Sequence, residues 1–191
     1  MTDVRPSLER ISDCSVRVRR AGAGPKLLFL HGAGGGQWLP FMDTLAQGFD
    51  VIVPEHPGFG ESETPAWLDN VSDLAYFYLD FIGALQLEQV HLVGLSMGGW
   101  IAAELAVRDQ RSLKSLTLVA AAGIHVAGAP KGDIFLWSRQ ELERNRFYRQ
   151  ELAEAMLAKQ LTQEETDIQM KNRLTMAKLA WQPRLHYPHL A

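Results

Sequence analysis

A serine lies near the middle of the segment Gly-Leu-Ser-Met-Gly-Gly, which runs from Gly94 to Gly99. Ser96 has a glycine two positions before it and another two positions after it, which is the pattern G-x-S-x-G. An apolar run typical of a strand precedes the segment, and apolar residues at helical spacing follow it. A serine on a sharp strand-to-helix turn projects its hydroxyl past its neighbours only if those neighbours are small. The pattern therefore predicts that Ser96 is a nucleophile on such a turn.

A plain glycine-rich turn is the alternative interpretation, because 16 glycines in 191 residues produce short glycine patterns by chance. The flanking strand and helix favour the nucleophile. The chemistry of a serine nucleophile on such a turn is acyl transfer, in which the transition state carries negative charge on one oxygen. Two backbone N–H groups stabilise that charge without reorganising, and the N–H of Met97 lies where a helix begins. The serine also needs a histidine as a base and an acid that orients this histidine.

The composition fits one soluble globular domain, or one domain with an insertion, because 47% of the 191 residues are hydrophobic and 21% are charged. The 22 acidic and 19 basic residues give a net charge of -3 without a basic stripe, which argues against nucleic acid as a partner. Cys14 is the only cysteine, so we expect neither an internal disulfide nor a cysteine-based zinc site.

The N-terminal residues carry charges where a signal peptide has an apolar core, and no uncharged run reaches the roughly 18 residues of a membrane span. A single cysteine also fits a reducing compartment. We therefore expect a cytoplasmic protein without membrane contact. No histidine lies in a spaced cluster with carboxylates, so we expect no metal site, and the predicted chemistry needs no cofactor.

The elements that position Ser96 are arranged as alternating strands and helices. Short apolar runs predict an edge strand from Cys14 to Arg19 and further strands over 26–30, 50–54, 89–95 and 113–119. Apolar residues at helical spacing predict helices over 38–45, after the N-cap Asn70, and after the serine. This alternation predicts an α/β protein with a parallel sheet that is covered on both faces.

From Ile134 to Trp181 the pattern is almost entirely helical and predicts no strand. Thr162 and Glu165 have the spacing of a capping box at the start of a helix. One apolar stripe at helical spacing consists of Met170, Leu174, Ala177 and Trp181. We expect a helical insertion over the sheet, which is a lid. The side chains of this segment that bear on its role are Phe135, Trp137 and Met156. They either line an apolar pocket or form the core of the lid itself, as equal alternatives.

Three motifs follow one another along the chain: HGAGG around Gly32, PGFGES around Gly58 and GLSMGG around Ser96. Together they resemble the α/β-hydrolases, in particular the branch of lidded esterases and carbon-carbon bond hydrolases. The resemblance implies an α/β-hydrolase fold, with a mostly parallel sheet flanked by helices and a helical lid, and no cofactor. The implied domains are a core over 1–124, a lid over 125–182 and a segment over 183–191 that leads back to the core.

The resemblance also implies roles for single residues. Ser96 takes the position of the nucleophile, and the backbone N–H groups of Ala33 and Met97 take the positions of the oxyanion hole. The residues expected to contact a small-molecule substrate are Gly32, Gly34 and Trp137.

The family places an acid and then a histidine after later strands, and this chain has no counterpart of those strands. We therefore expect the C-terminal strands of the fold to be absent, and we assign neither acid nor base. Among the histidines present, His31 is interpreted as structural and His56 as a solvated loop residue. His125 is the best substitute base, with a lid hinge as the alternative role. We expect His186 and His189 to be disordered or exposed.

Two features follow from these departures from the family pattern. Glu55 stands where the family usually has aspartate, which leaves open whether its loop keeps the usual hydrogen bonds. Without later strands, the segment from Leu113 to Val119 becomes an apolar sheet edge, and we expect a chain that is either marginally stable or self-associates through this edge.

We predict hydrolysis of an ester, or of a carbon-carbon bond, in a small and largely apolar substrate through an acyl-enzyme on Ser96. One alternative is a catalytically impaired, truncated hydrolase that binds a small ligand or serves as one part of an assembly. The other is a partial reading of a longer gene.

Overall fold

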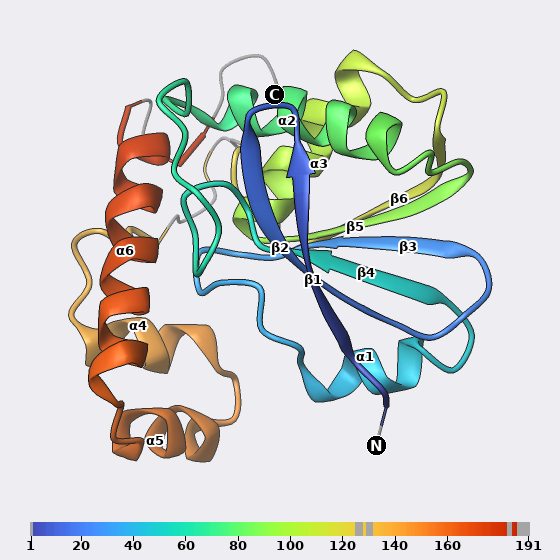
Figure 1. The fold of residues 1–191 in the computed structure, drawn as a ribbon. Coiled ribbons are helices and arrows are strands. Elements are labelled where there is room, and N and C mark those ends of the chain that lie inside the picture. Colours follow the sequence, from blue (N-terminus) through green and yellow to red (C-terminus); the bar gives the residue numbers. More distant parts are fainter. Residues whose placement is uncertain (1, 125–127, 129–131, 183–184, 187–191) are drawn as a thin grey trace. The chain divides into compact units, whose positions relative to one another are not determined.

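Strands from the first 119 residues form one sheet in the order β1-β2-β4-β3-β5-β6 (Figure 1). The computed structural model describes residues 2–124, 128, 132–182 and 185–186. The strands are β1 (Arg5–Ile11), β2 (Cys14–Ala21), β3 (Lys26–Leu30), β4 (Asp50–Pro54), β5 (Val90–Leu95) and β6 (Leu113–Val119). Strands β4, β3, β5 and β6 pair in parallel, whereas β1 pairs antiparallel with β2 and β2 pairs antiparallel with β4. The sheet is therefore mostly parallel, as predicted.

The sheet is covered on both faces by helices. The helices are α1 (Pro40–Leu45), α2 (Val71–Ala84), α3 (Met97–Arg108), α4 (Arg139–Arg146), α5 (Gln150–Ala158) and α6 (Gln163–Ala180). Helix α1 lies on one face of the sheet, and α2 and α3 lie on the other (Figure 1). Successive residues of a strand point to opposite faces, so the central strands must be apolar throughout to serve both layers.

The core on the α1 side consists of Ala21, Leu27, Phe29, Met42, Ala46, Val51 and Val53. The fully buried residues of β3, β4 and β5 that alternate with these are Leu28, Leu30, Ile52 and Leu92. Helix α2 starts at the predicted N-cap, where the amide of Asp73 donates to the Asn70 side chain over 3.2 Å and the Asp73 carboxylate accepts from the Asn70 amide over 2.9 Å. These reciprocal bonds satisfy the free amides of the first turn.

The chain divides into two compact units. One comprises Met1–His125 together with Ile168–Ala191, and the other comprises Val126–Asp167. Helices α4 and α5 lie in the second unit, and α6 begins there and continues into the first. The predicted capping box at the start of α6 is present, because the amide of Glu165 donates to the Thr162 hydroxyl over 3.1 Å and the Glu165 carboxylate accepts from the Thr162 amide over 3.0 Å.

One prediction about elements is wrong. The strand that begins at Cys14 is not at an edge, because β1 pairs with it along seven residues and β4 pairs with its other side. The sequence gives little sign of β1, since most of its side chains are exposed and polar.

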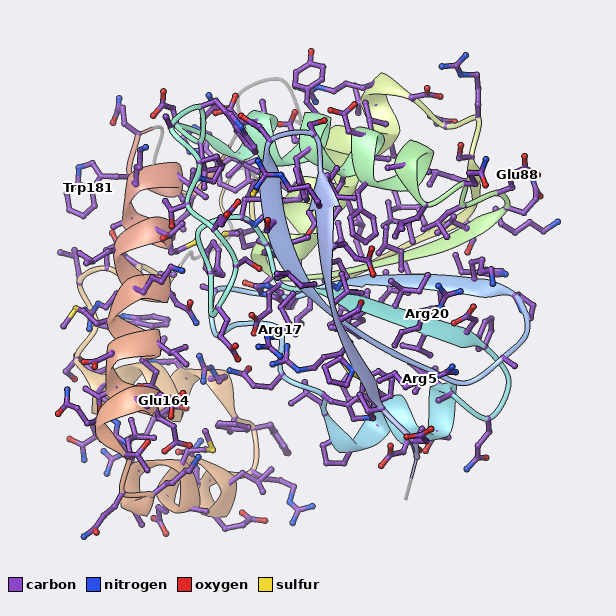
Figure 2. The ribbon with its side chains drawn as sticks, viewed as in Figure 1. Arg5, Arg17, Arg20, Glu88, Glu164 and Trp181 are labelled. Atoms are coloured by element: carbon purple, nitrogen blue, oxygen red, sulfur yellow. The ribbon has the colours of Figure 1, made fainter. Side chains whose placement is uncertain are left out.

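The apolar stripe of α6 does not form its buried face. Met170 is 57% exposed, Leu174 is 63% exposed and Trp181 is 52% exposed, and Trp181 projects outward from the end of the helix (Figure 2). The buried residues of the helix are instead Asn172, Thr175, Met176, Leu179 and Ala180. Polar side chains therefore occupy part of the buried face, so apolar periodicity does not indicate this face.

Strand β6 pairs with β5 alone among the described residues, so it forms one edge of the sheet. Leu116, Leu118 and Val119 are each about two-fifths exposed on this strand. An uncovered edge with apolar side chains is a surface for association. In the described part of the chain, no helix combines the length and the hydropathy that crossing a bilayer requires.

If self-association uses this edge, a charge on β6 will weaken it. We expect Leu118→Lys to shift the protein towards monomer in sedimentation velocity at 10 to 100 µM, roughly tenfold in the association constant, because a lysine must be desolvated at the contact. The matched control is Val107→Lys, which adds the same charge on α3 at a side chain that is 70% exposed. A monomeric starting protein, or equal effects of both changes, would contradict the prediction.

Candidate active site

The carboxyl ends of β3 and β5 lie side by side because these strands pair in parallel, with Leu30 opposite Gly94. After β3 the chain forms β4 on one side of β3, and the next strand, β5, lies on the other side of β3. A ligand site in an open α/β sheet lies beyond the carboxyl ends of the strands at such a reversal of order. The loop after β3, residues 31–36, and the turn after β5 therefore meet where a ligand is expected.

Ser96 occupies the turn between β5 and α3 with φ 54° and ψ -115°. This is the left-handed region, which residues with a Cβ rarely adopt and which costs on the order of 1–3 kcal/mol. Hydrogen bonds hold the backbone there: the Ser96 amide donates to Val119 over 2.9 Å, and the Ser96 carbonyl accepts from Trp100 over 3.1 Å and from Ala122 over 3.0 Å. The strand, strained serine and helix follow one another as the G-x-S-x-G pattern requires.

Glycine on both sides of the turn allows the close approach. A Cβ added at Gly94 would overlap the carbonyl group of Gly98, and one added at Gly98 would overlap the carbonyl group of Leu30 at the end of β3. A Cβ added at Gly32 would lie 3.2 Å from the Ser96 Cβ and 3.8 Å from its Oγ. The loop after β3 thus lies directly against the serine.

The two predicted oxyanion donors belong to these segments. Met97 is the first residue of α3, where amides have no partner within the helix. Ala33 follows Gly32 in the loop against the serine and is half-buried. Gly34, predicted to contact substrate, is exposed, and its carbonyl accepts hydrogen bonds from Gln37 and Asn172, each over 3.3 Å.

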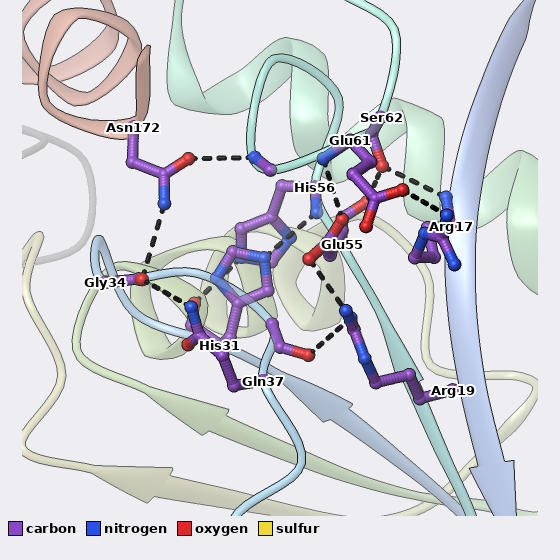
Figure 3. A network of polar contacts seen from close by, with 12 residues as sticks. Arg17, Arg19, His31, Gly34, Gln37, Glu55, His56, Glu61, Ser62 and Asn172 are labelled. Carbon is purple, nitrogen blue, oxygen red and sulfur yellow. Dashed lines mark hydrogen bonds and ion pairs between the residues drawn. The ribbon is translucent and has the colours of Figure 1, made fainter. Parts of the chain in front are cut away.

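His31 and His56 form a buried pair with their rings stacked 3.7 Å apart (Figure 3). The backbone amide of His56 donates to Nε2 of His31 over 3.0 Å, so Nδ1 of His31 carries the hydrogen and donates to the carbonyl of Gly32 over 2.6 Å. Nε2 of His56 donates to the carbonyl of His31 over 2.8 Å, so its Nδ1 accepts from the hydroxyl of Tyr78 over 2.5 Å. All four ring nitrogens are therefore occupied.

Burial keeps both rings neutral. Loss of water lowers the pKa of His31 to about 4, assisted by the charge of Arg19. Loss of water, together with the neighbouring His31, also lowers the pKa of His56 well below its ordinary value. The arrangement agrees with the structural role predicted for His31. The prediction of a solvated His56 is wrong, because its side chain has no exposed surface.

The loop after β4, residues 55–62, folds around the carboxylate of Glu55, which is 4% exposed. Arg19 donates to this carboxylate over 3.0 Å, and the backbone amide of Glu61 donates to it over 3.0 Å. The hydroxyl of Ser62 donates to the carbonyl of Glu55 over 3.0 Å. Glu55 therefore accepts hydrogen bonds from its own loop and from Arg19 at the position where the family usually has aspartate.

None of the described histidines forms a hydrogen bond with the Ser96 hydroxyl. His91 bonds Ser115 over 2.8 Å near the start of β5, at the opposite end of the strand from the serine. His186 is half-buried, not exposed as predicted, and its backbone bridges to Gly123. His125, the best substitute base, and His189 lie outside the described residues.

Two further site predictions concern a metal and the lid. Among the described residues, no group of three histidine, cysteine, aspartate or glutamate side chains is arranged to hold a metal ion. Trp137 lies in the second unit, where a Cβ added at Gly132 would overlap its ring. Phe135 and Met156 belong to the same unit.

Sequence reasoning missed the side chains of α6 that bind the two loops. Lys171, Asn172 and Thr175 form hydrogen bonds with Gly34 and with the segment 58–62. The apolar stripe lies on the opposite face of the helix. The sequence gives one signal for these side chains, namely that Asn172 and Thr175 lie one and four positions after Lys171. Polar residues at this spacing are also common on helices that face solvent.

A family model described as the alpha/beta hydrolase fold matches residues 25–184. The chain belongs to the α/β-hydrolase fold family. Among solved structures, a membrane phospholipase A described as a bacterial virulence factor superimposes with a TM-score of 0.72 at 25% identity, over 96% of this chain and 64% of that one. The fold predicted from the three motifs is thereby confirmed.

Curated relatives include enzymes of different activities. The dihydrolipoyllysine-residue acetyltransferase component of the acetoin cleaving system of Cupriavidus necator is 36% identical over 67% of this chain and 36% of its own length. The 2-hydroxymuconate semialdehyde hydrolase of a Pseudomonas species is 37% identical over 54% of this chain and 39% of its own length. Pimeloyl-[acyl-carrier protein] methyl ester esterase of Aeromonas hydrophila is 36% identical over 59% and 44%. The chain thus spans less than half the length of these relatives.

The strain at Ser96 predicts an unusual order of stabilities. Ser96→Gly is expected to be about 0.5 to 1 kcal/mol more stable than Ser96→Ala in urea denaturation, because glycine adopts φ 54° without a Cβ clash. The same pair of changes at Ser115, within β6, is expected to give the opposite order, since glycine weakens an ordinary strand. Alanine being the more stable at both positions would contradict the strain.

The neutral histidine pair predicts loss of stability in mild acid. The unfolded chain protonates His31 near its ordinary pKa of 6.5, whereas the folded pKa is about 4, so the unfolded state binds more protons between these values. The contribution is present above pH 6.5 and is lost as the pH falls towards 4. We expect the free energy of unfolding to fall by about 2 kcal/mol from His31 alone between pH 7.5 and pH 5.

Urea denaturation at both pH values measures this loss. His31→Gln should lower overall stability but flatten the pH dependence, and His91→Gln, outside the pair, should retain it. An equal pH dependence in wild type and His31→Gln would contradict the assignment.

Proposed function

We propose that this protein is a serine hydrolase that cleaves an ester, or a carbon-carbon bond, in a small and largely apolar substrate. The observation that carries the proposal is the strained backbone of Ser96 between β5 and α3, with the loop after β3 against it. Relatives named as a carbon-carbon hydrolase and as a methyl ester esterase support both reaction types.

In the proposed reaction, Oγ of Ser96 attacks the carbonyl carbon of the substrate while a base takes the hydroxyl proton. The resulting oxyanion is stabilised by the amides of Ala33 and Met97, which cost no reorganisation because their backbone is already held. The leaving group departs with the proton from the base, and water then hydrolyses the acyl-enzyme. His31 and His56 are not this base, since their nitrogens are occupied.

A second candidate is a ligand-binding or assembly module that does not turn over substrate. It is favoured by the engagement of His31, His56 and His91 in other hydrogen bonds. A relative named as a component of a cleaving system gives it further support. A cytoplasmic location belongs to either proposal and rests on the single cysteine, Cys14.

Turnover of p-nitrophenyl butyrate separates the two candidates. Ser96→Ala is expected to lower the rate at least about a hundredfold, because the nucleophile is lost while the surrounding residues are unchanged. Ser115→Ala, an exposed serine at the far end of β5 and β6, is the matched control and should retain the rate.

A fluorophosphonate probe gives a second measurement of the same residue. It should label Ser96, located by peptide mass spectrometry, in wild type and in Ser115→Ala but not in Ser96→Ala. Equal turnover and equal labelling in all three proteins would overturn the hydrolase proposal and leave the binding module.

A further inference from the structure

Helix α6 binds the loop after β4 through three polar side chains on its buried face. Lys171 donates to the carbonyl of Gly60 over 2.9 Å and to that of Ser62 over 2.7 Å. Thr175 donates to the carbonyl of Gly58 over 2.7 Å, and the side-chain oxygen of Asn172 accepts from the Gly60 amide over 2.8 Å. The loop is buried, so its backbone groups cannot form hydrogen bonds with water. The side chains of α6 supply the missing partners.

Asn172 alone among these three side chains also reaches the loop after β3. Its Nδ2 donates to the carbonyl of Gly34 over 3.3 Å (Figure 3). The residue is 2% exposed, so neither half of its amide has an alternative partner in bulk water. Gly35 has φ 106°, and a Cβ there would lie 2.9 Å from Nδ2 of Asn172. The loop is therefore shaped to receive this side chain closely.

The bond to Gly34 connects to Ala33 through two rigid peptide units. The Gly34 carbonyl shares its peptide plane with the amide of Gly35, which donates to the carbonyl of Gly32 over 3.2 Å. The Gly32 carbonyl in turn shares its plane with the amide of Ala33. In a trans peptide the N–H points opposite to the C=O. Fixing the two carbonyls therefore fixes the direction of the Ala33 N–H.

We propose that Asn172 is a positioning residue that orients the Ala33 amide for the oxyanion through this chain of hydrogen bonds. The inference rests on the proposed function, in which Ala33 supplies one of the two donors. Hydrogen bonds in series also polarise one another, by about 10–30% per bond. Asn172 thus both holds the loop and strengthens the donor at its end.

Other contacts define how far this role extends. Nδ1 of His31 donates to the same Gly32 carbonyl over 2.6 Å, and Arg19 donates to the carbonyl of Gly36 over 2.8 Å. The exposed Gln37 is a second donor to Gly34 over 3.3 Å. Loss of Asn172 should therefore misalign the Ala33 amide without unfolding the loop, and the effect should be smaller than loss of an oxyanion donor.

Asn172→Asp isolates the donor half of the side chain. The carboxylate still accepts from the Gly60 amide but presents only oxygen to the Gly34 carbonyl. The matched control is Thr175→Val, which removes one hydrogen bond on the same helix face but touches only the other loop. Asn172→Leu removes both bonds and serves if the aspartate variant does not fold.

Amide hydrogen exchange and ¹⁵N chemical shifts report directly on the conformation of the loop, and neither measurement requires substrate turnover. We expect Asn172→Asp to speed exchange at Gly35 about tenfold relative to β5 amides and to shift the Ala33 resonance, while Thr175→Val leaves both unchanged. Unchanged signals in Asn172→Asp, or equal changes in both variants, would overturn the positioning role.

Kinetics with p-nitrophenyl butyrate supply the second readout. Asn172→Asp should lower kcat about tenfold with KM within about twofold, because the donor acts in the transition state and not in substrate binding. A change confined to KM would contradict the inference. If wild type shows no turnover that depends on Ser96, the proposed function fails, and the amide measurements alone decide whether Asn172 positions the loop.

Discussion

The stacked, neutral imidazoles of His31 and His56 hold together the two loops on which the candidate site depends. Each ring bonds to the backbone of the other residue, so the ends of β3 and β4 are joined by side chains that carry no charge. A charged pair in the same place would need compensation for the loss of water around both groups. The neutral pair avoids that cost and leaves the Gly32 carbonyl firmly bonded. The position of the loop against Ser96 follows from this arrangement.

The candidate site combines strain at one residue with close backbone contact around it. Ser96 keeps its left-handed conformation because its amide and carbonyl are bonded to β6 and to the following turn. Gly98 lies against the end of β3 with no space for a side chain. The serine therefore cannot relax by moving its backbone, and its hydroxyl stays where the strand and helix place it. Rigidity of this kind is what a preorganised acyl-transfer site requires.

Much of the fold could be predicted because its signals are local. The central strands are continuous apolar runs, the turn at Ser96 has its own pattern, and the helix caps at Asn70 and Thr162 are formed by residues three positions apart. Strand β1 could not be found in this way, since a polar strand at a sheet edge buries little.

The candidate site could be predicted only in part. Burial of His56 depends on partners distant in the sequence, among them Tyr78 on α2. The buried face of α6 is defined by hydrogen bonds of Asn172, whose partners lie in loops more than a hundred residues away in the sequence. Neither kind of contact leaves a periodic trace, so neither is visible before the chain is folded.

The separation of Asn172 from its partners has a consequence for the order of biosynthesis. It follows Gly34 by 138 residues, which a ribosome adding about 5–20 residues per second translates in roughly 7 to 30 s. The backbone partners of Ser96 are at most 26 residues away, so all residues that hold the turn at Ser96 are synthesised much earlier than Asn172. Each newly made molecule thus passes through a period in which the serine is in place but the loop beside it lacks its last attachment.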